Sequence, residues 1–248
     1  MRRFFLPQPL SDQMIIEGND ARHIGRVLRM TPGDTLAVAG ADGRVAMARI
    51  SELSENQVFL QIVELIEDHT EPRTKVWLAQ GLAKGEKMDF IVQKAVELGV
   101  TGVIPLATDH AVIRWDENKR AERVKRWQKI AQEAAKQCGR SRIPQILPVM
   151  SLADCLAERL QLAQEIRTVM LYEGETPQSF RQVLSETAAF TPLLLLIGPE
   201  GGFSGGEVEL CRRQQVAAVT LGSRILRTET AALAALTIAM YHCGELGD

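Results

Sequence analysis

Three segments in the C-terminal part of the chain combine residue types that suit the binding of a small polar ligand. They are residues 170–175 with two glutamates, residues 196–204 with three glycines, and residues 221–231 with two arginines. Each segment follows an apolar run that is typical of a β-strand. Because ligands of parallel α/β sheets bind beyond the carboxyl ends of the strands, neighbouring strands would bring the three segments into one pocket.

The middle segment is rich in glycine at positions where a backbone can approach a ligand. Gly198, Gly201 and Gly202 lie close to Pro199 and Glu200, and glycine permits both positive φ and close contact. The run lacks the G-x-G-x-x-G spacing, and no lysine follows it as in a P-loop. The carboxylate would also repel a pyrophosphate. A ligand that combines adenosine with a cationic centre, such as S-adenosylmethionine, is more compatible.

The last segment carries the most distinctive charges. Arg224 and Arg227 flank two apolar residues, and we expect Thr228 to cap the final helix with Glu229 in its first turn. Capping gives no reason for an arginine at 227. We therefore predict that Arg227 binds a phosphate or stabilises an anionic base.

The elements that must position these segments alternate between strands and helices, which predicts an α/β domain with a mainly parallel sheet. Capping boxes are predicted at Ser151 with Asp154 and at Ser204 with Glu207. Strands are expected at residues 75–80, 101–108, 168–172, 192–197 and 216–221, and helices at 84–98, 117–138 and 228–241.

Residues 1–66 have a different sequence pattern, which predicts mostly short β-strands. Strands are expected at 34–40, 44–52 and 57–66, after a short helix at 20–29, and Asp-Gly at 42–43 is a strong hairpin signal. This pattern predicts a small barrel or a curled sheet. The polar segment 67–72 ends in proline, and we place the boundary between two domains, 1–70 and 73–248, at this point.

Composition excludes several protein classes. The 248 residues contain no run of eighteen apolar residues, so no membrane span is predicted, and the N-terminal apolar stretch is too short for a signal peptide. We expect a cytoplasmic protein. The four cysteines and four histidines are scattered, so we expect reduced thiols and no metal site.

The net charge of −2 conceals an uneven distribution along the chain. Residues 114–142 carry a net charge of +6 and residues 1–30 carry +2, whereas residues 31–72 carry −6. Phosphate binding needs a local positive face rather than a basic protein. A solvated helix face explains the run at 114–142 equally well.

Several motifs together resemble the RsmE family, the 16S ribosomal RNA (uracil-N3)-methyltransferases of the SPOUT class. They include Gly-Pro-Glu-Gly-Gly-Phe at 198–203 and Leu-Gly-x-Arg-Ile-Leu-Arg-x-Glu-Thr-Ala at 221–231. The resemblance covers the whole chain through residues 22–29, 84–88 and 93–99. A Gln-Ser-Gly-Arg stretch of the family is similar to residues 137–140, with Cys138 in place of the serine.

The resemblance implies a SPOUT domain with a deep trefoil knot, preceded by a PUA-like small β-barrel that helps to grip RNA. It also implies a homodimer with its pocket near the subunit interface, bent S-adenosylmethionine as cofactor, and a uridine of 16S rRNA in the small ribosomal subunit as target. The catalytic residues expected are Arg227 and Glu229, with Glu173 as a second candidate base. The residues expected to bind the cofactor are Leu171, Tyr172, Glu173, Leu196, Ile197, Gly198, Pro199, Glu200, Gly201, Gly202, Leu221, Gly222, Ile225, Leu226, Arg227, Thr228, Thr230 and Ala231.

RNA phosphates are expected to contact basic residues of both domains. These residues are Arg22, Arg26, Arg29, Lys84, Lys87, Arg114, Arg140 and Arg142. Other interpretations stay open. They are another SPOUT methyltransferase that acts on ribose 2′-OH or on tRNA, and a non-catalytic PUA-type RNA-binding protein. A nucleotide-binding enzyme is disfavoured by the missing phosphate-loop lysine.

Overall fold

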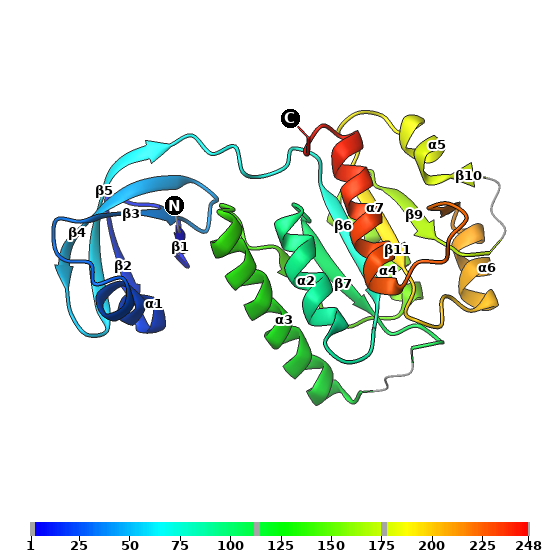
Figure 1. The fold of residues 1–248 in the computed structure, drawn as a ribbon, viewed down its shortest axis with the longest axis horizontal. Helices are drawn as coiled ribbons and strands as arrows, with labels where there is room; N and C mark the ends of the chain where they lie inside the picture. Colours follow the sequence, from blue (N-terminus) through cyan, green and yellow to red (C-terminus); the bar gives the residue numbers. More distant parts are fainter. Residues whose placement is uncertain (1–2, 112–114, 175–177, 248) are drawn as a thin grey trace. The chain divides into compact units, whose positions relative to one another are not determined.

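The computed structural model describes residues 3–111, 115–174 and 178–247 (Figure 1). Its contacts divide the chain into two compact units. The N-terminal unit contains residues 1–71 together with 135–143, and the C-terminal unit contains residues 72–134 and 144–248. The N-terminal unit is therefore built from two separate stretches of sequence.

The N-terminal unit is a curled five-stranded sheet in the order β1-β3-β4-β5-β2. The three predicted strands and their hairpin are confirmed, and β1 and β2 are additional short strands. Only the pair β1–β3 is parallel. Two register shifts in the β4–β5 pairing increase the local twist. The strands are β1 (Arg3–Phe5), β2 (Gln13–Glu17), β3 (Thr35–Ala39), β4 (Val45–Leu53) and β5 (Gln57–Ile66).

The predicted short helix of this unit begins as α1 (Gly18–Arg22) and continues as a π-helical turn, His23–Val27. Ala21 and Ile24 of this segment are buried in the core of the sheet. The periodicity of the sequence could not distinguish a π-turn from an α-turn, since both place these apolar residues inward.

Residues 135–143 join the N-terminal unit through the carboxylate of Glu71. Arg140 donates to both of its oxygens, with distances of 3.2 Å from Nε and 2.7 Å from Nη2. The backbone amides of Ser141 and Arg142 each donate to Oε1 at 3.0 Å. One carboxylate thus accepts four hydrogen bonds and fixes the conformation of this loop.

The burial of Arg140 contradicts its predicted role in phosphate binding. Its side chain is only 6% exposed and is paired with Glu71, so it stabilises the fold of the unit instead. Lys136 is buried in the same way against Asp20, with 2.9 Å between the charged atoms. Arg142 remains exposed and donates to the carbonyl of Asp42 at 3.2 Å.

The C-terminal unit is built on a seven-stranded sheet in the order β10-β12-β9-β11-β6-β7-β8, and every pairing is parallel. All residues of β6 and β11 are buried, as expected of strands covered on both faces. The strands are β6 (Val76–Gly81), β7 (Gly102–Leu106), β8 (Gln145–Ile146), β9 (Arg167–Leu171), β10 (Gln178–Ser179), β11 (Leu193–Ile197) and β12 (Ala217–Thr220).

Helices cover both faces of this sheet, and the predicted α/β fold is confirmed. Helix α7 packs against β6, β11 and α2, whereas α4 and α6 contribute to the apolar cluster of the opposite face. Ser204 and Glu207 form the predicted capping box of α6. In the part of the chain that the structure describes, no helix is both long and apolar enough to cross a membrane. The helices are α2 (Lys87–Glu97), α3 (Glu117–Cys138), α4 (Leu152–Leu162), α5 (Phe180–Ser185), α6 (Gly205–Arg213) and α7 (Thr228–His242).

We predict that Glu71→Gln lowers the free energy of unfolding by about 2–4 kcal/mol, because it removes the negative charge that pairs with the buried guanidinium of Arg140. Urea denaturation followed by circular dichroism measures this change. Glu67→Gln is the matched control, since the Glu67 side chain is 85% exposed, and it should change stability by less than about 0.5 kcal/mol. Equal stability of the two variants would contradict the prediction.

Candidate active site

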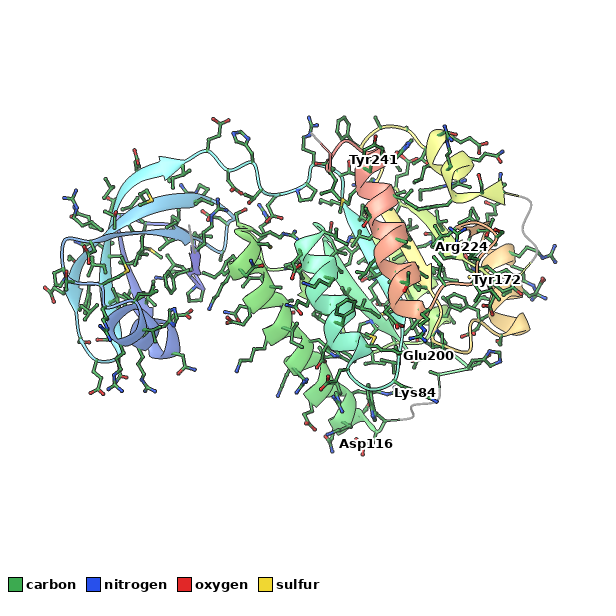
Figure 2. The ribbon with its side chains drawn as sticks, in the orientation of Figure 1. Lys84, Asp116, Tyr172, Glu200, Arg224 and Tyr241 are labelled. Atoms are coloured by element: carbon green, nitrogen blue, oxygen red, sulfur yellow. The ribbon has the colours of Figure 1, made fainter. Side chains whose placement is uncertain are left out.

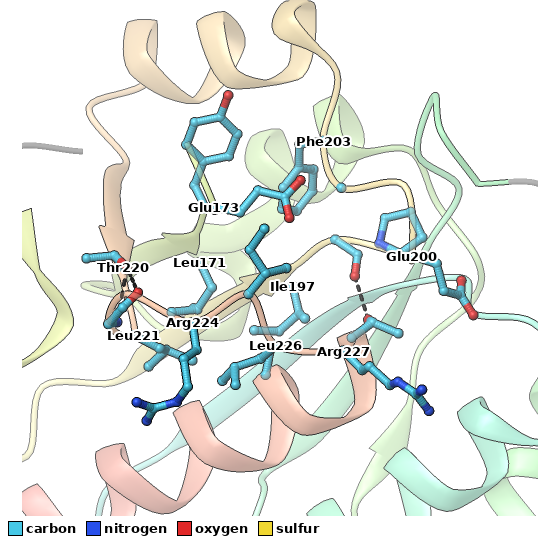
Figure 3. Close-up of a pocket in the computed structure, with 18 of the residues that line it drawn as sticks. Leu171, Glu173, Ile197, Glu200, Phe203, Thr220, Leu221, Arg224, Leu226 and Arg227 are labelled. Atoms are coloured by element: carbon cyan, nitrogen blue, oxygen red, sulfur yellow. Dashed lines mark hydrogen bonds between the residues drawn. The ribbon is translucent and has the colours of Figure 1, made fainter. Parts of the chain in front are cut away.

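A cavity of about 400 Å³ lies at the carboxyl ends of β9, β11 and β12 (Figure 3). Strand β9 lies between the other two, with Leu195 and Ala217 both in register with Val169. The loops that follow the three strands therefore emerge at one edge of the sheet. This arrangement confirms that the three segments found in the sequence form a single pocket.

Most residues expected at the cofactor site line this cavity, but four expected site residues do not. Leu196 is fully buried within the sheet, and Gly201, Glu229 and Thr230 are also outside the lining. The expected residues that line the cavity are Leu171, Tyr172, Glu173, Ile197, Gly198, Pro199, Glu200, Gly202, Leu221, Gly222, Ile225, Leu226, Arg227, Thr228 and Ala231. Further lining residues are Lys87, Phe203, Val219, Thr220, Ser223 and Arg224.

The glycines of the loop after β11 are needed partly for packing. A Cβ atom at Gly202, where φ is +65°, would lie 3.0 Å from the carboxylate of Glu173. At Gly198 it would lie 3.1 Å from the backbone of Gly202. Close packing of the loop against itself and against Glu173 of the neighbouring loop thus explains part of a glycine pattern that we assigned to ligand contact.

The carboxylate of Glu200 accepts hydrogen bonds from the first residue of α2 and from the segment just before this helix. Its Oε1 accepts from the backbone amide of Lys84 at 3.1 Å and from Nζ of Lys87 at 2.9 Å, and Figure 2 shows Lys84 close to Glu200. Burial alone would raise the pKa of Glu200, but the hydrogen bonds from Lys87 and the backbone outweigh it and lower the pKa. The same hydrogen bond raises the pKa of Lys87. Both groups are therefore charged at neutral pH.

Lys87 also lies 3.5 Å from Oε2 of Glu229. Its ammonium thus stands between one carboxylate of the glycine-rich loop and one of the first turn of α7. From the sequence we predicted a phosphate contact for Lys87. In this structure its ammonium forms ion pairs with Glu200 and Glu229 at the edge of the cavity.

Thr228 does not cap α7 as we expected. The N-cap residue is Arg227, without a side-chain cap, and the Thr228 hydroxyl donates to the carbonyl of Gly198 at 2.6 Å. It also accepts from Nε2 of the fully buried Gln80 at 2.9 Å. This junction connects β6, the glycine-rich loop and α7. A glutamine within an otherwise apolar strand was the one signal in the sequence that pointed to it.

Arg224 and Arg227 are both exposed on the loop between β12 and α7. Figure 3 shows their guanidinium groups reaching in different directions from that loop. Neither guanidinium forms a hydrogen bond or ion pair with a residue that the structure describes. They are the cationic groups of the cavity that remain available to a ligand.

The fold and the cavity define an RNA methyltransferase with an appended PUA domain. The model of the RNA methyltransferase domain matches residues 70–240, and that of the RNA methyltransferase PUA domain matches residues 16–63. The ribosomal RNA small subunit methyltransferase E of Bacillus subtilis is 35% identical, over 97% of this chain and 96% of that protein. The chain belongs to the family of ribosomal RNA small subunit methyltransferases E.

Solved structures agree with this assignment. A ribosomal RNA small subunit methyltransferase E from Neisseria gonorrhoeae, bound to S-adenosylmethionine, has a TM-score of 0.85 and 30% identity, with 97% of each chain covered. A methyltransferase from Legionella pneumophila, also with bound S-adenosylmethionine, has a TM-score of 0.81 and 33% identity, with 96% of each chain covered. The predicted family and enzyme class are confirmed.

Replacing Thr228 with valine should lower the free energy of unfolding by about 2–4 kcal/mol, because the carbonyl of Gly198 and the amide of Gln80 both lose a buried partner. Thermal and urea denaturation measure the loss. Thr230→Val is the matched control on the same helix, since Thr230 is exposed, and it should be nearly neutral. Two variants of equal stability would show that the junction contributes little.

Proposed function

We propose that this protein transfers a methyl group from S-adenosylmethionine to N3 of a uridine in 16S ribosomal RNA. The observation that carries the proposal is the cavity at the ends of three parallel strands, in a chain of this family. Relatives of similar fold were solved with the same cofactor. Ribosomal RNA as substrate implies a cytoplasmic site of action.

The residues of the cavity fit this cofactor. Apolar side chains such as Ile197 and Leu226 can cover the faces of an adenine, and backbone groups of the loops can bind its edge. Glu173 provides a carboxylate in the same cavity. The volume of about 400 Å³ lies in the usual range of small-molecule sites. When bound, S-adenosylmethionine supplies an electrophilic methyl group.

The protein must mainly orient the uracil and accept the proton of N3. Arg227 lines the cavity and has no hydrogen-bond or ion-pair partner among the described residues, so its guanidinium can bind the uracil oxygens and stabilise the anion formed when N3 loses its proton. Glu173 lines the cavity as well, whereas Glu229 lies outside the lining and faces Lys87. We therefore favour Glu173 over Glu229 as the proton acceptor.

The N-terminal unit is proposed to hold the RNA through exposed arginines. Arg22, Arg26, Arg29 and Arg142 are exposed there, and Lys84 is exposed beside the cavity. Arg114 lies outside the residues that the structure describes. The two units are proposed to act as the RNA-binding domain and the knotted methyltransferase domain, with the boundary at about residue 72.

We also propose that the protein is a homodimer through α7. This helix is apolar on all sides, and yet Ile238 and Tyr241 are 40% and 69% exposed; Figure 2 labels Tyr241 on α7. Phe90, on the contacting helix α2, is 46% exposed. Exposed large apolar side chains on two packed helices are typical of a protein interface.

The dimer proposal predicts that Ile238→Asp dissociates the protein, because the new carboxylate would be buried without a partner. Sedimentation velocity should show a dimer for the wild type and a monomer for the variant at the same micromolar concentration. Leu160→Asp is the control, since Leu160 is exposed on α4, and it should stay dimeric. A monomeric wild type would refute the proposal.

The proposed reaction is tested by incubating the protein with S-adenosylmethionine and either 30S particles or naked 16S rRNA. Mass spectrometry of the nucleosides should detect 3-methyluridine. A ribose 2′-O-methyl product would instead favour the alternative function, that of a SPOUT methyltransferase acting on the ribose 2′-OH. Absence of cofactor binding in calorimetry would favour a non-catalytic RNA-binding protein.

In the same assay, Arg227→Ala should lower kcat by about 10²–10³-fold, the usual cost of removing one donor to a developing anion. Its affinity for S-adenosylmethionine should be retained. Arg213→Ala removes an exposed arginine of α6 that pairs with Glu209, and it should leave kcat unchanged. Full activity of the Arg227 variant would exclude the role proposed for that residue.

A further inference from the structure

The π-helical turn of the N-terminal unit presents two apolar side chains to solvent. Val27 is 65% exposed and Leu28 is 41% exposed; we call these two residues the Val27–Leu28 tip. Hydrogen bonds from the Leu28 amide to the His23 carbonyl at 2.9 Å, and from Met30 to Ile24 at 3.1 Å, fix the turn. Single π-turns are rare and are frequent at functional sites. The turn therefore holds the tip outward.

The backbone after the tip is also unusual. Arg29 has a φ of 54°, in the left-handed region that residues other than glycine seldom adopt. Its guanidinium makes no hydrogen bond or ion pair with any residue that the structure describes. The chain thus adopts a disfavoured backbone conformation at an arginine whose side chain has no such partner in the described part of the chain.

Two further exposed arginines flank the tip. Arg22 donates to the side chain of Asn56 at 2.9 Å, and Arg26 pairs with Glu55 where both side chains are about two-thirds exposed. Exposed pairs of this kind contribute little to stability. Their cations can therefore turn toward a polyanion at small cost.

A second exposed apolar pair in the same unit has acidic neighbours in the chain, whereas the neighbours of the tip are arginines. Val63 and Leu65 of β5 are 52% and 61% exposed, but their neighbours in the chain are Glu64 and Glu67. Residues 61–67 offer two carboxylates and no cation to a phosphate backbone. The arginines, rather than apolar exposure alone, distinguish the tip as a site for a nucleic acid.

We propose that the Val27–Leu28 tip packs against unstacked bases of the RNA substrate while Arg22, Arg26 and Arg29 bind the flanking phosphates; this inference rests on the proposed function. Sequence-specific recognition of RNA usually targets single-stranded loops and bulges whose bases are splayed out. An apolar surface between cations can contact the faces of such bases. The tip would contribute affinity that does not depend on salt.

The test compares RNA binding of the double variant Val27→Ser/Leu28→Ser with that of the wild type. The probe is unmethylated 16S rRNA in a filter-binding titration at several salt concentrations. The variant should bind about tenfold more weakly, which follows from the apolar area lost. The slope of log Kd against log salt should stay unchanged, because no phosphate contact is removed. In methylation assays KM for the RNA should rise while kcat stays constant.

Two matched variants separate the contributions. Arg29→Gln should lower the magnitude of the salt slope by about 0.7–0.9, the change expected for one phosphate contact. Val63→Ser/Leu65→Ser should bind RNA like the wild type, although it removes as much exposed apolar surface from the same unit. Thermal denaturation should show that all three variants fold.

Unchanged RNA affinity of the tip variant would overturn the inference, and so would a change in its salt slope or a loss of thermal stability. A change in its sedimentation would assign the tip to contact between copies of the chain, which also overturns it. A wild type that binds RNA but neither binds S-adenosylmethionine nor methylates would instead refute the proposed function. A tenfold weaker tip variant in that case would still support the inference.

Discussion

The parallel pairing of β9, β11 and β12 is the constraint on which the arrangement of the site depends. Because the three strands run in the same direction with β9 in the middle, their following loops must share one edge of the sheet. Parallel strands cannot be joined by tight turns and need crossover connections. Helix α6 belongs to the connection between β11 and β12, and the capping box of Ser204 and Glu207 marks where this helix begins.

Hydrogen bonds between the loops then convert this shared edge into a cavity. The hydroxyl of Thr228 connects the glycine-rich loop to Gln80 and α7, and Lys87 stands between two carboxylates at its edge. Together these contacts hold the glycine-rich loop against β6 and the first turns of α2 and α7. Arg224 and Arg227 are left for a ligand. The loops around the cavity are thus connected to one another, and the loop that enters α7 carries two cations that form no hydrogen bond or ion pair with the residues that the structure describes.

The positive charge of residues 114–142 is partly neutralised by ion pairs in the folded protein. Arg126 pairs with Asp89, Lys136 with Asp20, and Arg140 with Glu71. Three of its cations are therefore engaged by acids that are distant in the sequence. The positive charge of a segment overestimates the positive charge that a partner can reach, because the fold uses some of it internally.

The sequence by itself determined the class of fold, the positions of the main strands and helices, and the segments that form the cavity. Hydrophobic periodicity, capping boxes and glycine clusters are local signals, and they are visible in a linear chain. Only the tertiary structure decided the π-turn that holds the Val27–Leu28 tip outward and the burial of Arg140. It also decided the partners of Thr228 and Lys87. The burial of Arg140 and the partners of Thr228 depend on contacts such as Arg140–Glu71 and Gln80–Thr228, whose partners are far apart in the chain, and no local pattern specifies such a contact. The π-turn is held by local hydrogen bonds, but the apolar periodicity is the same for an α-turn and does not distinguish the two.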